Sequence, residues 1–284
     1  MYRAILVPLD GSPVSERALP YARFLAQAVQ AELVLLRVVE VRPFTDSEET
    51  WNEIVAEAYI GRFRSDLAVA GLAETAVKIG NPAREILDAI KARDLDLIVM
   101  STHGRSGLGR FLHGSVAEEV MRRSPVPILL VSPRCIRTWS SDHPGRVLVP
   151  LDGSELAEQA LVPASQFAEI LAAELHLIRV VAPSAGLSSQ RTPSLLSEAG
   201  AGETAEAQDY LTGVAEGLRT SGRAVSTLVK RGNPADMISA SAREEDADVI
   251  VIASHRRAGV SRLIQGSVAA RLIQEANVPV CLVS

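Results

Sequence analysis

The chain has 284 residues and a formal net charge of −5 at pH 7, with 47% hydrophobic, 22% charged and 4% aromatic residues. Residues 1–140 carry 17 basic and 17 acidic groups, so the negative charge lies in the second half, and neither half has the basic stripe of a nucleic-acid-binding surface. No apolar run is long enough to span a bilayer, so we expect neither a membrane nor a nucleic-acid partner.

Short apolar runs alternate with helical stretches along the first half. The apolar runs lie at 4–9, 32–39, 73–79, 96–101 and 127–132, and the helical stretches at 13–29, 46–71, 82–93 and 114–124. Strands that are apolar on both faces and alternate with helices are typical of a parallel sheet covered on both sides. Ser12-Pro13 and Asn81-Pro82 each place a capping side chain before a proline, which predicts two helix starts.

The second half repeats this pattern. Its predicted strands lie near 146–151, 174–181, 224–230, 248–253 and 279–283. The connection between its second and third predicted strands is ten residues longer than the matching connection in the first half. The extra length falls in 182–203, a segment rich in Ser, Gly, Ala and Pro. We interpret that segment as a mobile loop.

An internal repeat relates the two halves. Residues 96–132 align without a gap with residues 248–284, and VPLDGS and GNPA each occur once in each half in the same order. Matches that keep their order indicate a duplicated domain. We therefore predict one domain over 1–133, a linker over 134–145 and a second domain over 146–284. Each is expected to be a doubly wound α/β domain, a five-stranded parallel sheet of order 3-2-1-4-5 with helices on both faces.

The linker is short, so we expect the two domains to pack together as an internal pseudo-dimer. Each domain ends in an apolar edge strand, and an unpaired edge of this kind invites aggregation. We expect these edges to pair, either within the chain or between subunits.

The chain begins with a strand pattern and has no separate signal-peptide core, which predicts a cytoplasmic location. Cys135 and Cys281 do not occupy matching positions in the repeat, so neither a disulfide framework nor a zinc site is indicated. The three histidines at 113, 143 and 176 show no metal-ligand spacing, and we predict no metal ligand.

The strand order predicts where a ligand binds. Ligands of doubly wound sheets lie outside the carboxyl ends of the strands, where the winding reverses, here between strands 1 and 4. Asp10 ends the first strand, and glycines at 104, 107, 109 and 114 precede a helix that begins at Ser115. Glycines let backbone amides approach an anion, and a helix N-terminus attracts phosphate. The sequence therefore predicts a nucleotide phosphate cradle with Asp10 opposite it.

The motif S-x2-G-x9-G-S, formed by Ser101, Gly104, Gly114 and Ser115 behind the VPLDGS strand end, resembles the universal stress protein family. The ATP-binding members of that family carry G-x2-G-x9-G-[S/T], and the resemblance covers nearly the whole chain as two tandem domains. It implies that Asp10 approaches ribose or phosphate and that Ser101, which replaces a glycine, crowds the ribose. The candidate nucleotide-binding residues of the first half are Asp10, Val38, Met100, Ser101, Gly104, Arg105, Gly114, Ser115 and Val116.

The second copy departs further from the motif. Ala253 and Arg256 replace both leading glycines, and Arg256 either fills the phosphate seat or donates to a phosphate. We expect nucleotide binding in this half to be weak or absent, which leaves one ATP per chain. The second-site candidates are Asp152, Val180, Ala253, Arg256, Gly266, Ser267 and Val268.

Simpler structural roles remain open for several residues. Asp10 and Asp152 can stabilise the strand-to-helix turn through a side-chain hydrogen bond to the backbone. The two GNPA turns are interpreted as helix caps, and His103 and His255 either contact a ligand or stabilise a turn. Arg105 and Arg110 either hold phosphates or lie in solvent.

Three functions fit the resemblance. The first is an ATP-binding stress protein, with or without Mg²⁺, that acts as a nucleotide-dependent sensor or regulator and forms a homodimer. The second is a slow ATPase or autokinase, although no Walker lysine motif and no paired base and nucleophile occur, so we predict no catalytic residue. The third is an interaction scaffold that binds no nucleotide. A dinucleotide-dependent oxidoreductase is excluded, because DGSPVS rather than G-x-G-x-x-G follows the first strand.

Overall fold

The computed structural model describes residues 1–40, 46–68, 73–103, 114–135, 138–140, 145–182, 193–254 and 268–284. The first half contains β1 (Ala4–Leu9), α1 (Pro13–Glu16), α2 (Leu19–Val29), β2 (Glu32–Glu40), α3 (Asp46–Ala68), β3 (Ala73–Gly80), α4 (Pro82–Ala92), β4 (Leu97–Ser101), α5 (Ser115–Arg123) and β5 (Ile128–Val131). The second half contains β6 (Arg146–Pro150), α6 (Glu155–Glu158), α7 (Leu161–Ile170), β7 (Glu174–Val181), α8 (Pro193–Arg219), β8 (Val225–Arg231), α9 (Pro234–Glu244), β9 (Val249–Ala253), α10 (Val268–Glu275) and β10 (Val280–Val283).

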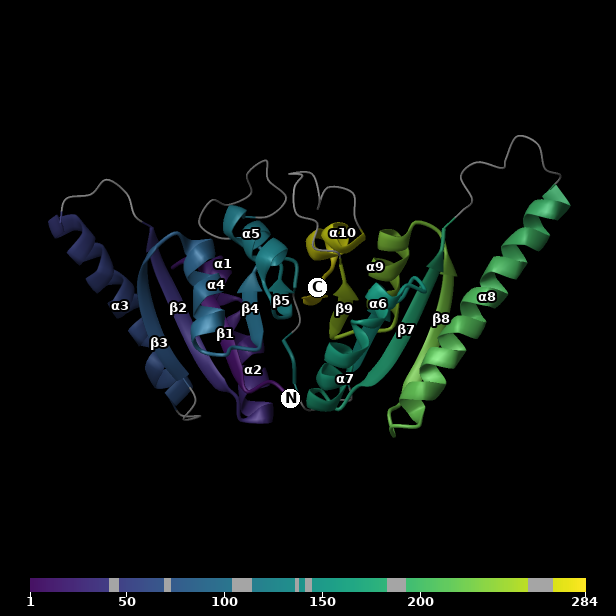
Figure 1. The fold of residues 1–284 in the computed structure, drawn as a ribbon, viewed down its shortest axis with the longest axis horizontal. Coiled ribbons are helices and arrows are strands. Elements are labelled where there is room, and N and C mark those ends of the chain that lie inside the picture. The colour runs from purple at the N-terminus through teal and green to yellow at the C-terminus, as the bar shows by residue number, and fades with distance from the viewer. Residues whose placement is uncertain are drawn as a thin grey trace.

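The strands of the two halves form one continuous sheet of order β3-β2-β1-β4-β5-β10-β9-β6-β7-β8. Within each half the strands are parallel and follow the predicted order 3-2-1-4-5. The halves meet where β5 and β10 pair antiparallel, with Leu129 opposite Cys281. The expected pairing of the apolar edge strands therefore occurs within the chain, and Figure 1 shows α3 and α8 at the two outer ends of the molecule.

Hydrophobic clusters cover both faces of the sheet. One cluster joins the sheet to α2, α3, α7 and α8 through residues such as Leu25, Ile60, Phe167 and Leu211. The other joins it to α4, α5, α9 and α10. All five residues of β4 are buried, as expected for a strand covered on both sides. This double winding leaves the carboxyl ends of β1, β2 and β4 open for a site.

The helix starts agree with the capping signals in the sequence. The Ser12 side chain accepts a hydrogen bond from Ser15 N at the start of α1, and Asn81 Oδ1 accepts from Arg84 N at 3.0 Å at the start of α4. Asn233 caps α9 in the same way. The interpretation of both GNPA turns as caps is thus confirmed.

Two sequence predictions need correction. The stretch 13–29 is two helices, and Pro20 lies in the first turn of the second, where its missing N–H costs no helical hydrogen bond. The interpretation of 182–203 as a mobile loop is wrong for its second part, because residues 193–203 form the beginning of α8. The remaining residues, 183–192, lie outside the described part of the chain.

The linker carries an aromatic side chain into the junction of the two halves. The ring centroid of Trp139 lies 5.0 Å from that of Tyr21 and 5.9 Å from those of Phe24 and Phe167, and only 8% of Trp139 is exposed. Its Nε1 donates a hydrogen bond to the backbone oxygen of Asp248 at 2.9 Å. Tyr21 and Phe24 belong to the first half and Phe167 and Asp248 to the second, so Trp139 joins both.

Among the described residues, no helix combines the length and apolar character needed to cross a membrane.

Candidate functional site

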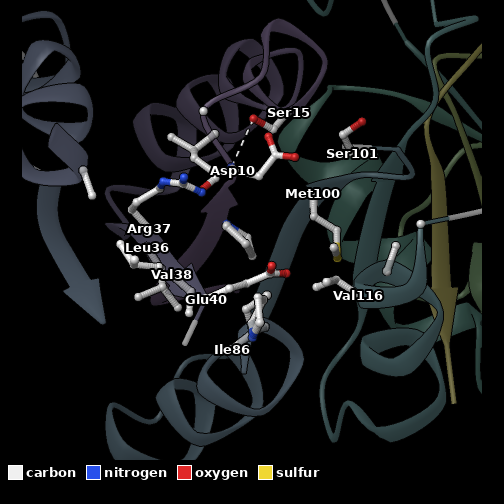
Figure 2. A pocket seen from close by; sticks show the side chains of 18 of the residues that line it. Asp10, Ser15, Leu36, Arg37, Val38, Glu40, Ile86, Met100, Ser101 and Val116 are labelled. Carbon is white, nitrogen blue, oxygen red and sulfur yellow. Dashed lines mark hydrogen bonds between the residues drawn. The ribbon is translucent and has the colours of Figure 1, made fainter. Parts of the chain in front are cut away.

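A cavity of about 790 Å³ opens at the carboxyl ends of β1, β2 and β4 in the first half. Its walls also include residues of α3, α4 and α5. Figure 2 shows Asp10, Ser15 and Ser101 toward one end, and Val38, Glu40 and Ile86 toward the other. The cavity lies at the predicted place, where the winding of the sheet reverses.

Most residues proposed from the sequence line this one cavity. The lining includes Asp10, Val38, Met100, Ser101, Gly114, Ser115 and Val116. Gly104 and Arg105 lie outside the described residues. Residues from four separate segments are thus brought together around one space, and their contact with a ligand stays a prediction.

Asp10 takes part in the turn that follows β1. Its Oδ1 accepts hydrogen bonds from the backbone N–H of Ser12 at 2.9 Å and from the Ser12 hydroxyl at 2.6 Å. The backbone N–H of Asp10 donates to Ser15 Oγ at 3.3 Å, the dashed line in Figure 2. Gly11 has a φ of 85°, a left-handed conformation that favours glycine. The turn-stabilising role of Asp10 is therefore confirmed, and the turn fixes its carboxylate in the cavity wall.

The N-terminus of α5 opens on the cavity. Its N-cap is Gly114, so no side chain caps this helix, whereas serine or asparagine side chains cap α1, α4, α6 and α9. The backbone N–H groups of Ser115, Val116 and Ala117 donate to no described residue. Free N–H groups and the helix dipole give this end of the cavity positive potential.

The part of the cavity beside this helix end is largely apolar. Leu36 and Val38 of β2 face Ile86 of α4, with Met100 of β4 and Val116 of α5 beside them. These residues also contribute to the core on that face of the sheet, so their positions are fixed by packing. An apolar slot next to an anion-attracting helix end suits a ligand with a flat apolar part and a charged part.

Sequence reasoning missed several polar residues of the lining. They are Arg37 and Glu40 at the end of β2, and Asn52 and Tyr59 of α3. Tyr59 donates a hydrogen bond to Glu16 Oε1 at 3.0 Å, and burial together with that carboxylate raises the pKa of Tyr59 to about 12. The second half makes the same contact, because Tyr210 donates a hydrogen bond to Glu158 Oε1 at 2.8 Å.

His103 also lines the cavity, directly after β4. Its Nδ1 lies 2.8 Å from the Thr102 hydroxyl, and its backbone N–H donates to Ser101 Oγ at 3.4 Å. These contacts fit a residue that stabilises the turn. Burial lowers the pKa of His103 below its ordinary value of 6.5.

We expect His103 to titrate below 6.5 in the folded protein. As the pH falls, the unfolded chain takes up a proton at this position before the folded chain does, so His103 favours folding above pH 6.5. That contribution is lost as the pH falls through the folded pKa. An NMR titration, with the His103 resonance assigned from a His103→Gln variant, measures the midpoint. A midpoint at or above 6.5 contradicts this reading of its environment.

The sequence profile of the universal stress protein family matches residues 1–132 and 144–284. This chain belongs to the universal stress protein family. The two matched ranges mean that it is a tandem member with two repeats of the family's domain.

Individual universal stress proteins resemble either one half or the whole chain. MJ0531 of Methanocaldococcus jannaschii is 38% identical over 141 residues, a match that covers 46% of this chain and 82% of that protein. YxiE of Bacillus subtilis is 35% identical over 147 residues, covering 46% of this chain and 99% of that protein. The solved structure of a universal stress protein from Archaeoglobus fulgidus covers 98% of this chain and 97% of its own, with a TM-score of 0.75 and 26% identity. The tandem arrangement therefore has a counterpart of the same fold.

The second universal stress protein repeat forms the same turn after its first strand. Asp152 Oδ1 accepts hydrogen bonds from Ser154 N and Ser154 Oγ, at 2.9 and 2.6 Å, as Asp10 does from Ser12. Burial disfavours the charge of Asp152, but the bonds from Ser154 and the nearby Arg179 outweigh it and keep the pKa of Asp152 below its usual range. The turn-stabilising alternative is confirmed for this aspartate too.

Arg179 of the second half makes different contacts from its counterpart Arg37 in the first half. Arg37 is buried and donates to the backbone oxygen of Leu9, at 3.4 Å. The guanidinium carbon of Arg179 lies 5.0 Å from the ring centroid of Tyr210, and a Cβ at Gly153 would lie 3.2 Å from its Nη1. Gly153 and Tyr210 match Gly11 and Tyr59, which line the cavity of the first half, so Arg179 lies in the corresponding region of the second half.

The remaining second-site candidates divide into two groups. Val180 lies in β7, Ala253 ends β9 and Val268 begins α10, each at the place of its counterpart in the first half. Arg256, Gly266 and Ser267 lie outside the described residues. The predicted weakness of this half therefore rests on the sequence motif and on the position of Arg179.

Proposed function

We propose that the first half of this universal stress protein binds an adenine nucleotide, ATP with Mg²⁺, in the cavity between β1 and β4. The protein would act in the cytoplasm as a nucleotide-dependent sensor or regulator of the stress response. It would bind one nucleotide per chain and form a homodimer of the two-domain chain. One observation carries the proposal: the candidate residues of four separate segments line a single cavity with an uncapped helix end at one side.

The dimensions and chemistry of the cavity support a nucleotide. Its volume of about 790 Å³ is within the usual range for small-molecule sites. The first-turn N–H groups of α5 suit phosphate oxygens, and the apolar slot between Val38 and Met100 suits the faces of a base. Asp10 and Ser101 lie toward the end of the cavity away from Val38 and Ile86, where a ribose or a phosphate would lie.

The residues also fit a nucleotide-bound magnesium ion. Mg²⁺ is commonly held by one or two carboxylates together with substrate phosphates, and it would neutralise phosphate charge here. Asp10 offers a carboxylate in the wall near Ser15 and Ser101, held by its bonds to Ser12. Our proposal gives Asp10 the role of holding the metal or the ribose and assigns it no role in hydrolysis.

Calorimetric titration of nucleotide-stripped protein with Mg-ATP tests the proposal. We expect a stoichiometry near one per chain, lost in Gly104→Arg and raised toward two in Arg256→Gly, because an arginine at either position would occupy the phosphate seat. A stoichiometry of two in the parent protein would mean that Arg256 binds phosphate. No binding to the parent protein, confirmed by a second method, would leave the interaction scaffold as the better reading.

A further inference from the structure

The outer face of α3 carries apolar residues that the chain itself leaves exposed. α3 packs on the sheet through buried residues such as Ile60. On the opposite face of the helix, Trp51 is 65% exposed and Ile54 is 51% exposed, and Ala58 and Gly61 are exposed as well. We call these four residues the outer stripe. Figure 1 shows α3 at one outer end of the molecule, and a helix that is apolar on both faces is typically covered on both.

α8 of the second half shows that the fold does not need this stripe. The two helices align through Tyr59 and Tyr210, which make the same hydrogen bond in their own halves. The positions of α8 that match the outer stripe are Gly202, Ala205, Asp209 and Thr212. α8 packs on β7 and β8 without a large apolar side chain at any of them. The outer stripe therefore serves something other than the attachment of the helix to the sheet.

The spacing and sizes of the outer stripe suit a second copy of the same helix. Its members recur at i, i+3, i+7 and i+10, the spacing of the seam between two paired helices. The large residues come first and the small ones last, and a Cβ added at Gly61 would meet nothing within 4 Å. Antiparallel pairing about a twofold axis would place Trp51 of one copy against Gly61 of the other. Ile54 would lie against Ala58 in the same way, so large residues would face small ones.

The charges along α3 also favour the antiparallel arrangement. Residues 46–57 hold five acidic groups and no basic one, whereas residues 58–68 hold two arginines and one aspartate. Antiparallel pairing places the acidic half of each helix along the basic half of the other and sets the two helix dipoles in opposite directions. Parallel pairing would set the two acidic halves side by side. The helix is thus complementary to itself in one orientation.

We infer that the outer stripe is the interface of a homodimer in which α3 of two chains pair antiparallel about a twofold axis. The inference rests on the proposed function only for the homodimer, whose interface it supplies, and is independent of nucleotide binding. A single pair of helices buries less than the about 800 Å² per partner of a standard interface. The dimer is therefore weak and reversible, with a dissociation constant in the micromolar range.

Sedimentation velocity of the nucleotide-stripped chain, over a wide range of protein concentration, tests the inference. The proteins are the parent chain, Trp51→Ala, Gly61→Leu, the double variant with both changes, and Gly213→Leu as the control. Gly213 is a matched control because it lies on α8, the helix at the other outer end, and a Cβ added there also meets nothing within 4 Å.

We expect the parent chain and Gly213→Leu to dimerise with the same dissociation constant. Trp51→Ala should weaken the dimer about thirtyfold or more, the loss expected for an interface hot spot. Gly61→Leu should weaken the dimer as well, because it fills the space that Trp51 of the second copy needs. It should not lower the thermal midpoint of unfolding, because leucine is a better helix former than glycine. The double variant exchanges the large and small positions and should recover most of the lost affinity.

Three results would overturn the inference. A parent chain that stays monomeric excludes the homodimer and leaves the outer stripe to another partner, while titration with Mg-ATP still decides nucleotide binding separately. A dimer that both single variants retain has its interface elsewhere, so the homodimer stands without this surface. A double variant as weak as the single variants excludes the contact between positions 51 and 61.

Discussion

Replacing Trp139 with alanine should lower the free energy of unfolding by about 3 to 5 kcal/mol, the range for a large aromatic removed from a core. The side chain is almost fully buried among Tyr21, Phe24 and Phe167. Its loss would leave a cavity where the two halves meet and would leave the backbone oxygen of Asp248 without its indole donor. Urea denaturation followed by far-ultraviolet circular dichroism measures the change.

The chain supplies a matched control for this substitution. Trp51 on α3 is 65% exposed, so Trp51→Ala should change the unfolding free energy by no more than about 0.5 kcal/mol. Trp139→Phe keeps an aromatic ring, smaller than the indole, but removes the N–H donor. It should lower the free energy of unfolding by less than Trp139→Ala does. Equal losses in Trp51→Ala and Trp139→Ala would show that Trp139 does not hold the halves together.

Much of this architecture could be predicted, because the strong signals are local. Strands buried on both faces, such as β4, appear in the sequence as unbroken apolar runs, and the duplicated VPLDGS and GNPA segments give the domain count. The alternation of strands and helices predicts a parallel sheet covered on both faces, although it does not by itself determine the order 3-2-1-4-5. The role of Trp139 could not be predicted, because its partners lie in α2, in α7 and directly before β9, all distant in sequence.

The errors and omissions have physical reasons. Residues 193–203 contain serine and glycine, which disfavour helix, but they continue a helix whose later turns bury Ala207, Leu211 and Ala215 against the sheet. In the site, the motif identified residues of β1, β4 and α5 because its glycines and aspartate are distinctive. Glu40 and Asn52 belong to no distinctive spacing, and only the packing of α3 over β2 shows that they share a cavity with Asp10.

A Ser115→Asp substitution should weaken ATP binding about hundredfold and leave the fold at least as stable. Ser115 is exposed and is the first residue of α5, where an acidic side chain interacts favourably with the helix dipole, by about 0.3 to 1 kcal/mol. The same carboxylate would stand in the seat proposed for phosphate, and a like-charge repulsion of about 3 kcal/mol corresponds to that loss of affinity. Calorimetric titration with Mg-ATP and thermal unfolding without nucleotide measure the two effects.

Opposite changes in stability and affinity distinguish a ligand seat from a site where substitution simply damages the fold. Ser267→Asp is the matched control, because Ser267 corresponds to Ser115 in the repeat and its substitution makes the same change in net charge. With one nucleotide in the first half, Ser267→Asp should leave the affinity for ATP unchanged. Loss of affinity in Ser267→Asp with full binding in Ser115→Asp would instead place the nucleotide in the second half. Equal, small losses in both variants would mean that the two substitutions act through net charge, and that the end of α5 is not a phosphate seat.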